Sequence, residues 1–177
     1  DKDDEFDLKV QELNEPSLLS KITNLVKTGK PYPKKESEQD GGTKQDPNLK
    51  FLVRYQYAPL KMQEDSRKFC KAMVRAKKVY RKEDIIRMGK QEVNPGFGVE
   101  GALTYSIWLY KGGARCEHKW FRKTYVIKDG KKTETTTTAA KSKGFVAPVN
   151  EQLVPVAPKD MQYKGYTAAY WNKMGFK

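Results

Sequence analysis

The dipeptide Asp129-Gly130 is the sequence feature that most constrains the fold of this chain. Asp-Gly readily adopts the two positive φ angles of a type I′ turn, which joins neighbouring antiparallel strands. The flanking runs, 119–127 and 131–138, are rich in threonine, valine and isoleucine. Because β-branched residues favour strands, the sequence predicts an antiparallel hairpin over these two runs.

Alternation of side chains predicts two further strands. Residues 51–57 place four apolar side chains on one face, those of Phe51, Val53, Tyr55 and Tyr57. Residues 105–110 alternate in the same way, and Gly112-Gly113 ends the run. A period of two residues is typical of a strand, so we expect both segments in the sheet.

Helical spacing predicts two short helices in the same region. Asp65-Ser66 offers a cap, and it precedes four residues that share one helical face: Phe69, Cys70, Met73 and Val74. The second helix runs from Lys82 to Met88 and ends at Gly89. The expected fold class is α+β, a small and mostly antiparallel sheet with two or three short helices and long extended N- and C-terminal arms.

The composition changes along the chain and predicts four parts. Residues 1–28 combine an acidic segment with an amphipathic helix, and residues 29–49, rich in Lys, Gly, Pro and Asp, are expected to form a flexible linker. Residues 50–138 hold the strands and helices of the α+β core domain. Residues 139–177 show no period, and Pro148, Pro155 and Pro158 favour an extended C-terminal arm with aromatic residues.

Charge separates the first 15 residues from the rest. The 177 residues carry a net charge of +13, whereas residues 1–15 hold seven acidic and two basic side chains, a net charge of −5, which leaves +18 for the remainder. The acidic segment can dock on the basic body or on a neighbouring copy, or it can be a solvated terminus. The first residue is Asp1, so we expect either a trimmed start or a proteolytic product of a longer precursor.

Several classes of protein are disfavoured by the residues present. No stretch approaches the roughly 18–20 apolar residues of a membrane span, so we expect no membrane partner. With 2 Cys and 1 His, neither a disulfide framework nor a metal site with several histidines can form.

Cys70, Cys116 and His118 are the candidate metal ligands, and zinc is the metal that suits them. A fourth ligand would come from Asp65, Glu117 or water. The alternatives are two packed thiols beside a hydrogen-bonded histidine, a Cys70–Cys116 disulfide, or a Cys–His nucleophile. Because the sequence has no Gly-rich phosphate loop and no persuasive acid pair, we expect that the protein is not an enzyme.

Basic and aromatic residues are mixed around the start of the predicted hairpin. Arg115, Lys119, Arg122 and Lys123 are the candidate contacts to nucleic acid or to an acidic partner. On a strand, we expect cations and rings to alternate between faces, an arrangement that can follow phosphates without reading sequence. The alternative is a solvated basic face over an aromatic core.

Apolar residues near both ends are candidate anchors for partners. Residues 16–28 form an amphipathic pattern that includes Leu18, Leu19, Ile22 and Leu25. The C-terminal segment spreads Tyr163, Tyr166, Tyr170 and Trp171 among Gly and Lys. A helix of this length is marginal alone, so each segment must pack either on its own domain or on another subunit.

An ordered series of short motifs resembles the C-terminal part of the phage Mu F-like head morphogenesis proteins of tailed bacteriophages. The series is Asp65-Ser66-Arg67-Lys68-Phe69-Cys70, then Val79-Tyr80-Arg81-Lys82-Glu83-Asp84-Ile85, then Lys111-Gly112-Gly113-Ala114-Arg115-Cys116-Glu117-His118-Lys119-Trp120. The stretch Tyr105–Gly113 also looks like virion proteins of crAss-like phages. The resemblance covers roughly residues 65–125.

The resemblance implies a structural role in a virion assembled in the host cytoplasm. The expected protein is a minor head or portal-vertex-associated component that contacts the portal, the major capsid protein or other virion proteins, with nonspecific contact to packaged DNA. We expect its two ends to clamp neighbouring subunits. The alternative is a DNA-binding accessory or internal cargo protein packaged with the genome.

Overall fold

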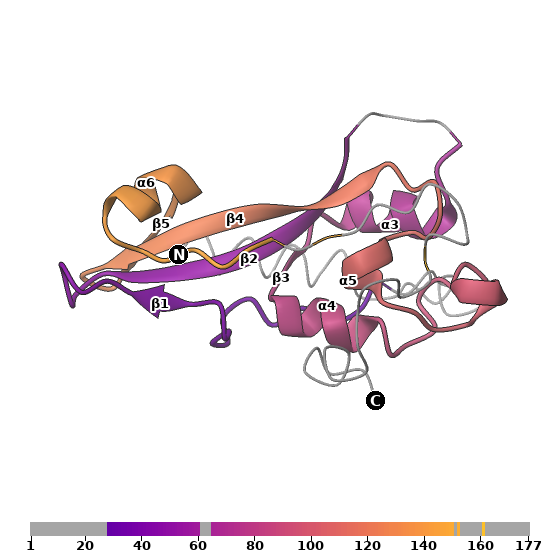
Figure 1. Ribbon diagram of the computed structural model, residues 1–177, viewed down its shortest axis with the longest axis horizontal. Coiled ribbons are helices and arrows are strands. Elements are labelled where there is room, and N and C mark those ends of the chain that lie inside the picture. Colours follow the sequence, from indigo (N-terminus) through magenta and orange to yellow (C-terminus); the bar gives the residue numbers. More distant parts are fainter. Residues whose placement is uncertain (1–27, 61–64, 151, 153–160, 162–177) are drawn as a thin grey trace, which may run out of the picture.

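The computed structural model describes residues 28–60, 65–150, 152 and 161 of the chain. These residues form a five-stranded antiparallel sheet with short helices packed on it (Figure 1). The strand order is β1-β2-β4-β5, and β3 pairs with β2 on the edge that β1 also uses. The expected α+β class with a mostly antiparallel sheet is therefore confirmed.

Two long strands form the centre of the sheet. β2, Lys50–Pro59, pairs with β4, His118–Lys128, along its whole length. β5, Lys131–Thr135, returns beside β4 through a turn in which Asp129 and Gly130 have φ angles of 51° and 75°. Both angles are positive, as a type I′ turn requires, so the predicted hairpin is confirmed.

Short strands complete the other edge. β1, Gly41–Gly42, pairs with the start of β2, and β3, Val79–Tyr80, pairs with Tyr55 and Gln56 further along.

The inner face of the sheet is the one on which β2 carries the buried side chains of Phe51, Val53, Tyr55 and Tyr57. Helices cover this face in two groups (Figure 1). At one end, α6, Thr137–Ser142, packs on β4. At the other end lie α3, Lys68–Ala76, α4, Lys82–Met88, and α5, Ile107–Tyr110, together with the 3₁₀ turn Val99–Gly101. Between these helices and the sheet lies a buried aromatic core that includes Phe51, Tyr55, Tyr80, Trp108 and Trp120.

Helix α4 has the bounds that the sequence predicts, Lys82–Met88. Its first turn is closed by Asp84, whose carboxylate accepts a hydrogen bond from the Arg81 backbone N–H at 3.1 Å and ion-pairs with the Arg81 and Arg87 side chains at 2.7 Å. The same carboxylate accepts the Tyr32 N–H at 2.9 Å. Asp84 therefore joins the helix to the segment that precedes the sheet.

The strand predicted over residues 105–110 is wrong. Residues Ile107–Tyr110 form helix α5, which begins where the Ser106 hydroxyl accepts the Leu109 N–H at 3.1 Å. All four helical residues are buried. Because neither alternating set is exposed, the sequence pattern has no polar face, and a short run of this kind cannot distinguish a strand from a buried helix.

The segment 29–49, expected as a flexible linker, is instead packed on the sheet. Asp40 accepts the Val53 N–H at 2.9 Å and forms a buried ion pair with Arg54 at 2.6 Å. Arg54 also donates to the carbonyl oxygens of Pro33 and Lys35, each at 2.8 Å. Polar composition suggested a linker, but here the polar groups bind one another across the edge of β2.

Two further boundaries differ from the prediction. Helix α3 has Arg67 at its N-cap with no capping side-chain bond, so Asp65-Ser66 is not the cap. The second hairpin arm ends at Thr135, because the Thr136 hydroxyl accepts the Ala139 N–H and starts α6.

The C-terminal arm expected over 139–177 begins as part of the core. Residues up to Ser142 are helical, and Phe145 stacks on Phe51 with ring centroids 4.9 Å apart. Gln152 binds the backbone of Trp120, since its amide accepts the Trp120 N–H at 3.0 Å and donates to the Trp120 carbonyl at 2.9 Å. Residues 151, 153–160 and 162–177 of this arm lie outside the described residues, as do residues 1–27.

Candidate functional site

The three predicted metal ligands lie together at the end of the molecule that holds α3. Cys70 lies in α3, Cys116 lies in the segment that leads into β4, and His118 is the first residue of β4. The sulfur atoms of Cys70 and Cys116 are 3.8 Å apart, and Cys116 Sγ is 3.6 Å from His118 Nδ1. All three residues are buried, and their ligand atoms lie within 4.8 Å of one another. We call these three side chains the Cys–His cluster.

A sharp turn returns the chain towards α3 and so creates the Cys–His cluster. Gly113 N–H donates to the Tyr110 carbonyl at 2.7 Å, and Cys116 N–H donates to the Gly113 carbonyl at 3.2 Å. A Cβ at Gly112 would lie 2.4 Å from Cys70 Sγ and 3.1 Å from Cys116 Sγ. The sequence needs glycine there because the backbone passes directly beside the two sulfurs.

Tyr57 closes the cluster from inside the core. Its hydroxyl lies 3.3 Å from Cys70 Sγ and 3.4 Å from Cys116 Sγ, and its ring stacks on the His118 imidazole at 5.2 Å. Trp120 packs edge-on against the Tyr57 ring at 5.0 Å. The tyrosine therefore bridges the thiols and the imidazole.

The two thiols are not equivalent. Hydrogen bonding to Cys70 lowers the pKa of Cys116, with further lowering from His118 and Tyr57. The pKa of Cys70 is raised, because its thiol bonds to Cys116 and because it is buried. The Gly112 N–H also points at Cys116 Sγ, at 3.3 Å. Cys116 is thus the sulfur that carries negative charge most readily.

A cleft of about 210 Å³ opens onto the Cys–His cluster, and all three of its side chains line it. The other lining residues are Asp65, Ser66, Arg67, Arg115 and Glu117, two acidic and two basic side chains with one hydroxyl. Arg67 is fixed there because its guanidinium donates to the Ala114 carbonyl at 2.6 Å and lies over the Phe97 ring. The cleft is polar and charge-balanced.

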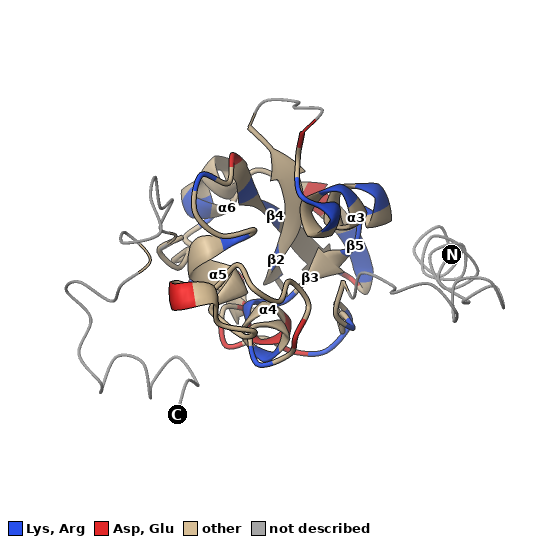
Figure 2. Ribbon diagram, turned by 90° about the vertical axis from the view of Figure 1, so that its right-hand side faces the viewer, with Lys and Arg blue, Asp and Glu red and all other residues tan. Residues whose placement is uncertain are grey.

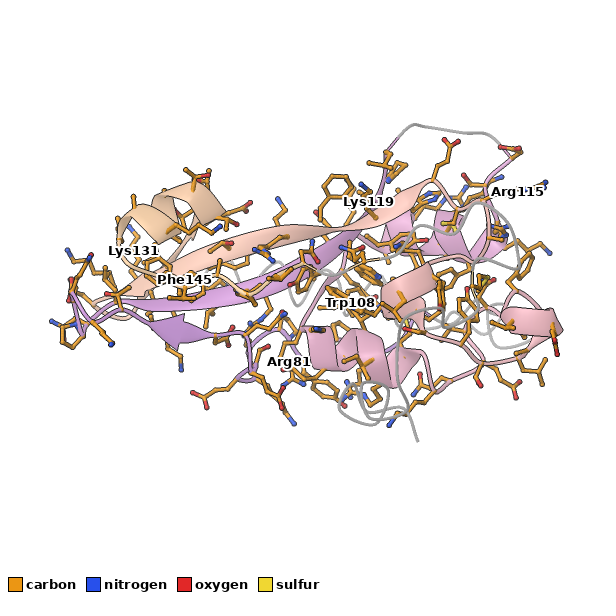
Figure 3. All side chains as sticks on the ribbon, viewed as in Figure 1. Arg81, Trp108, Arg115, Lys119, Lys131 and Phe145 are labelled. Carbon is orange, nitrogen blue, oxygen red and sulfur yellow. The ribbon has the colours of Figure 1, made fainter. Side chains whose placement is uncertain are left out.

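The residues expected to contact nucleic acid separate into three places. Lys119 and Lys123 lie on the outer face of β4, Arg115 lines the cleft, and the Arg122 guanidinium donates to the Pro148 carbonyl at 2.5 Å. Figure 3 shows Arg115 and Lys119 towards the end that carries the cleft, and Lys131 and Phe145 at the opposite end. Arg122 is thus held within the fold.

The eight candidate partner anchors lie outside the described residues, so their contacts stay a prediction: Leu18, Leu19, Ile22, Leu25, Tyr163, Tyr166, Tyr170 and Trp171.

Lys111 is a residue of the site that sequence reasoning missed. It is fully buried, its φ of 51° is unusual for a residue with a side chain, and its ammonium donates to the Leu109 carbonyl at 2.8 Å. Burial lowers its pKa to about 7. The only sequence signal was its place between a buried apolar run and Gly112-Gly113, and that signal does not distinguish a buried lysine from an exposed one.

Three comparisons with known proteins found no match for this chain. No family model matches the chain, and no curated protein or solved structure is significantly similar to it. In the part of the chain that the structure describes, no helix has the length and apolar character needed to cross a membrane.

Proposed function

We propose that this chain is a structural component of a tailed-phage virion, a minor head or portal-vertex-associated protein that clamps neighbouring subunits with its two ends. The observation that carries the proposal is the position of the motif residues. Arg67 binds the Ala114 carbonyl, Cys70 meets Cys116, and Trp120 packs against Tyr80 at 5.5 Å. The three motifs of the phage-like series thus pack against one another in the fold.

The motif residues help to build the scaffold, so the resemblance supports a shared fold, while the virion role rests on the resemblance itself. The portal or the major capsid protein is the proposed partner, and the virion is the proposed location. The described residues form the packed body, and the apolar residues near both ends supply the proposed clamps. Segments that become ordered on a partner can bury a large area at modest affinity, which suits assembly.

The test is incorporation into particles. A phage that lacks this gene is complemented with the intact chain, with Leu19→Glu/Ile22→Glu, or with Tyr170→Ala/Trp171→Ala, and purified DNA-filled particles are analysed by mass spectrometry. We expect the intact chain at a fixed ratio to the portal, and a loss of roughly tenfold for both clamp variants. Lys90→Ala, at an exposed residue, is the control and should enter particles normally.

Absence of the intact chain from purified particles would refute the virion proposal. Normal incorporation of both clamp variants would refute the clamping mechanism. Circular dichroism of each purified variant shows whether it is folded.

A second candidate function, contact with packaged DNA, is favoured by the outer face of the sheet. Lys119, Phe121, Lys123 and Tyr125 follow one another on that face of β4, because alternate residues of a strand share a face. The exposed fraction of Phe121 is 41%, and Lys132 lies over the Tyr125 ring at 4.9 Å. Cations and rings are therefore interleaved on one face, rather than alternating between faces as the sequence suggested. Figure 2 shows further Lys and Arg residues on β5 and α3.

Cations on one face can follow the phosphate backbone of duplex DNA without sequence preference. The test measures the affinity of the full chain for duplex DNA at several salt concentrations. Lys119→Glu/Lys123→Glu should weaken binding at least tenfold and flatten the salt dependence. Lys141→Glu/Lys143→Glu has the same charge change on exposed residues around α6 and should retain most of the affinity. An equal loss in both variants would show that net charge alone, and not this face, attracts the nucleic acid.

A further inference from the structure

Two of the three distances within the Cys–His cluster match those around a bound metal ion. Zinc bonded to sulfur at about 2.3 Å and to nitrogen at about 2.0–2.1 Å in tetrahedral geometry sets two sulfurs about 3.8 Å apart, and a sulfur and a nitrogen about 3.6 Å apart. The Cys70–Cys116 and Cys116–His118 separations are 3.8 Å and 3.6 Å. The third edge, from Cys70 Sγ to the imidazole, is at most 4.8 Å, so binding requires one of these side chains to move towards the other two.

The surroundings suit ligands that carry negative charge. The Gly112 N–H points at Cys116 Sγ at 3.3 Å, and the Tyr57 hydroxyl lies within 3.4 Å of both sulfurs. Donors of this kind around metal-bound sulfur orient the ligands and stabilise the thiolate form. Gly112 is also the residue whose missing Cβ leaves room for the two sulfurs.

The cleft provides both an entry path and a fourth coordination position. Cys70, Cys116 and His118 all line it, which gives an ion in solvent a route towards the three side chains. The carboxylates of Asp65 and Glu117 line the same cleft. Water or one of these carboxylates can therefore supply the fourth ligand that zinc requires.

We propose that Cys70, Cys116 and His118 bind one zinc ion that joins α3 to the start of β4. Two thiolates and an imidazole form a donor set that zinc prefers over the hard cations. The ion would join segments 46 residues apart in the sequence, and so would stabilise the end of the molecule that carries the cleft. This proposal is independent of the proposed virion function.

The test uses the full chain with a purification tag that lacks histidine and cysteine, kept reduced throughout. Elemental analysis should find about one zinc ion per chain, and that zinc should survive dialysis. Titration of the metal-free chain with Co²⁺ should give a sulfur-to-cobalt charge-transfer band and intense visible bands typical of tetrahedral sites. Cys116→Ser and His118→Gln should each reduce bound zinc at least tenfold.

Tyr80→Phe is the matched control, since it also removes a buried polar atom from the core but lies outside the cluster. It should retain the zinc and the cobalt spectrum. The spectrum of the unsubstituted chain remains decisive even if a cluster variant fails to fold. A reduced, folded chain that binds neither zinc nor cobalt would overturn the proposal.

Discussion

At Gly112 the backbone passes so close to both cysteine sulfurs that a methyl group has no room. Gly112→Ala places a Cβ 2.4 Å from Cys70 Sγ, so either the turn or α3 must shift. We expect the free energy of unfolding to fall by about 1–3 kcal/mol, as for other overpacked cores. Chemical denaturation of the purified chain measures the change.

Gly41→Ala is the control for this substitution. Its Cβ would lie 3.4 Å from the Phe145 ring, an ordinary contact. We expect a change below about 1 kcal/mol. Equal destabilisation by the two variants would contradict the close approach of Gly112 to the sulfurs.

Lys111 couples the stability of the fold to pH. Burial lowers its pKa from 10.5 to about 7, so between these values the folded chain holds a neutral amine while the unfolded chain holds a proton. Because the unfolded state binds more protons there, the free energy of unfolding should rise with pH, by up to about 1.4 kcal/mol per pH unit. Below about pH 7 the folded lysine is charged and the cost of burying it is fully present.

Lys111→Met keeps the length of the side chain and removes the titrating group. Urea unfolding of both chains at pH 7 and pH 9 isolates the contribution of the lysine, since the other groups titrate alike in both. We expect the variant to gain less stability between the two pH values. An identical gain in both chains would show that Lys111 is protonated in the fold at pH 9.

At the scale of elements, Asp40 and Arg54 attach the segment before β1 to the edge of β2. The exposed fractions of their side chains are 4% and 2%, and the ion pair is 2.6 Å long. Asp40→Asn leaves Arg54 charged and buried without its counter-ion. Removing one partner of a buried pair costs about 3–5 kcal/mol, so we expect a loss of that order in denaturant unfolding.

Glu36→Gln is the matched control in the same segment. Glu36 pairs with Lys50 at 2.6 Å, but 85% of its side chain is exposed. Pairs of this kind contribute little, so no measurable change is expected. If Asp40→Asn also left the free energy of unfolding unchanged, the stability of the segment would not depend on its buried ion pair.

Local signals predicted some elements well and others not at all. Helix α4 has Gly89 at its end and a polar first turn, and the β4–β5 turn has Asp129-Gly130, so both could be located from neighbouring residues alone. Helix α5 could not, since all of its residues are buried and burial depends on tertiary packing. Segment 29–49 was misjudged because its polar residues bind partners that are distant in sequence.

The candidate site was predictable to a similar extent. The residue types indicated Cys70, Cys116 and His118 as ligands of one metal ion, and the structure brings the three together. The contact of Tyr57 with both sulfurs and the burial of Lys111 depend on how the sheet packs against α3 and α5. Neither leaves a pattern in the sequence.

At the scale of the whole molecule, stability is concentrated where β2 and β4 pair. These strands are joined along the whole of β2, and their inner faces are sealed by the buried aromatic core. The amides of this ladder should exchange with solvent only through global unfolding, since no smaller opening breaks them. By contrast, the exposed residues Val146 and Val149 lie in a stretch without regular structure and should exchange much faster.

Hydrogen exchange followed by mass spectrometry tests this distribution and the proposed clamps in one experiment. In the purified chain, peptides from β2 and β4 should be the slowest to exchange. When the portal or capsid partner is added, the same peptides should be unchanged, because their amides are already protected. Peptides that contain Leu18 to Leu25 or Tyr163 to Trp171 should gain protection, since the proposal places these residues on the partner. Protection of the end peptides that is identical with and without the partner would show that the two ends do not clamp it.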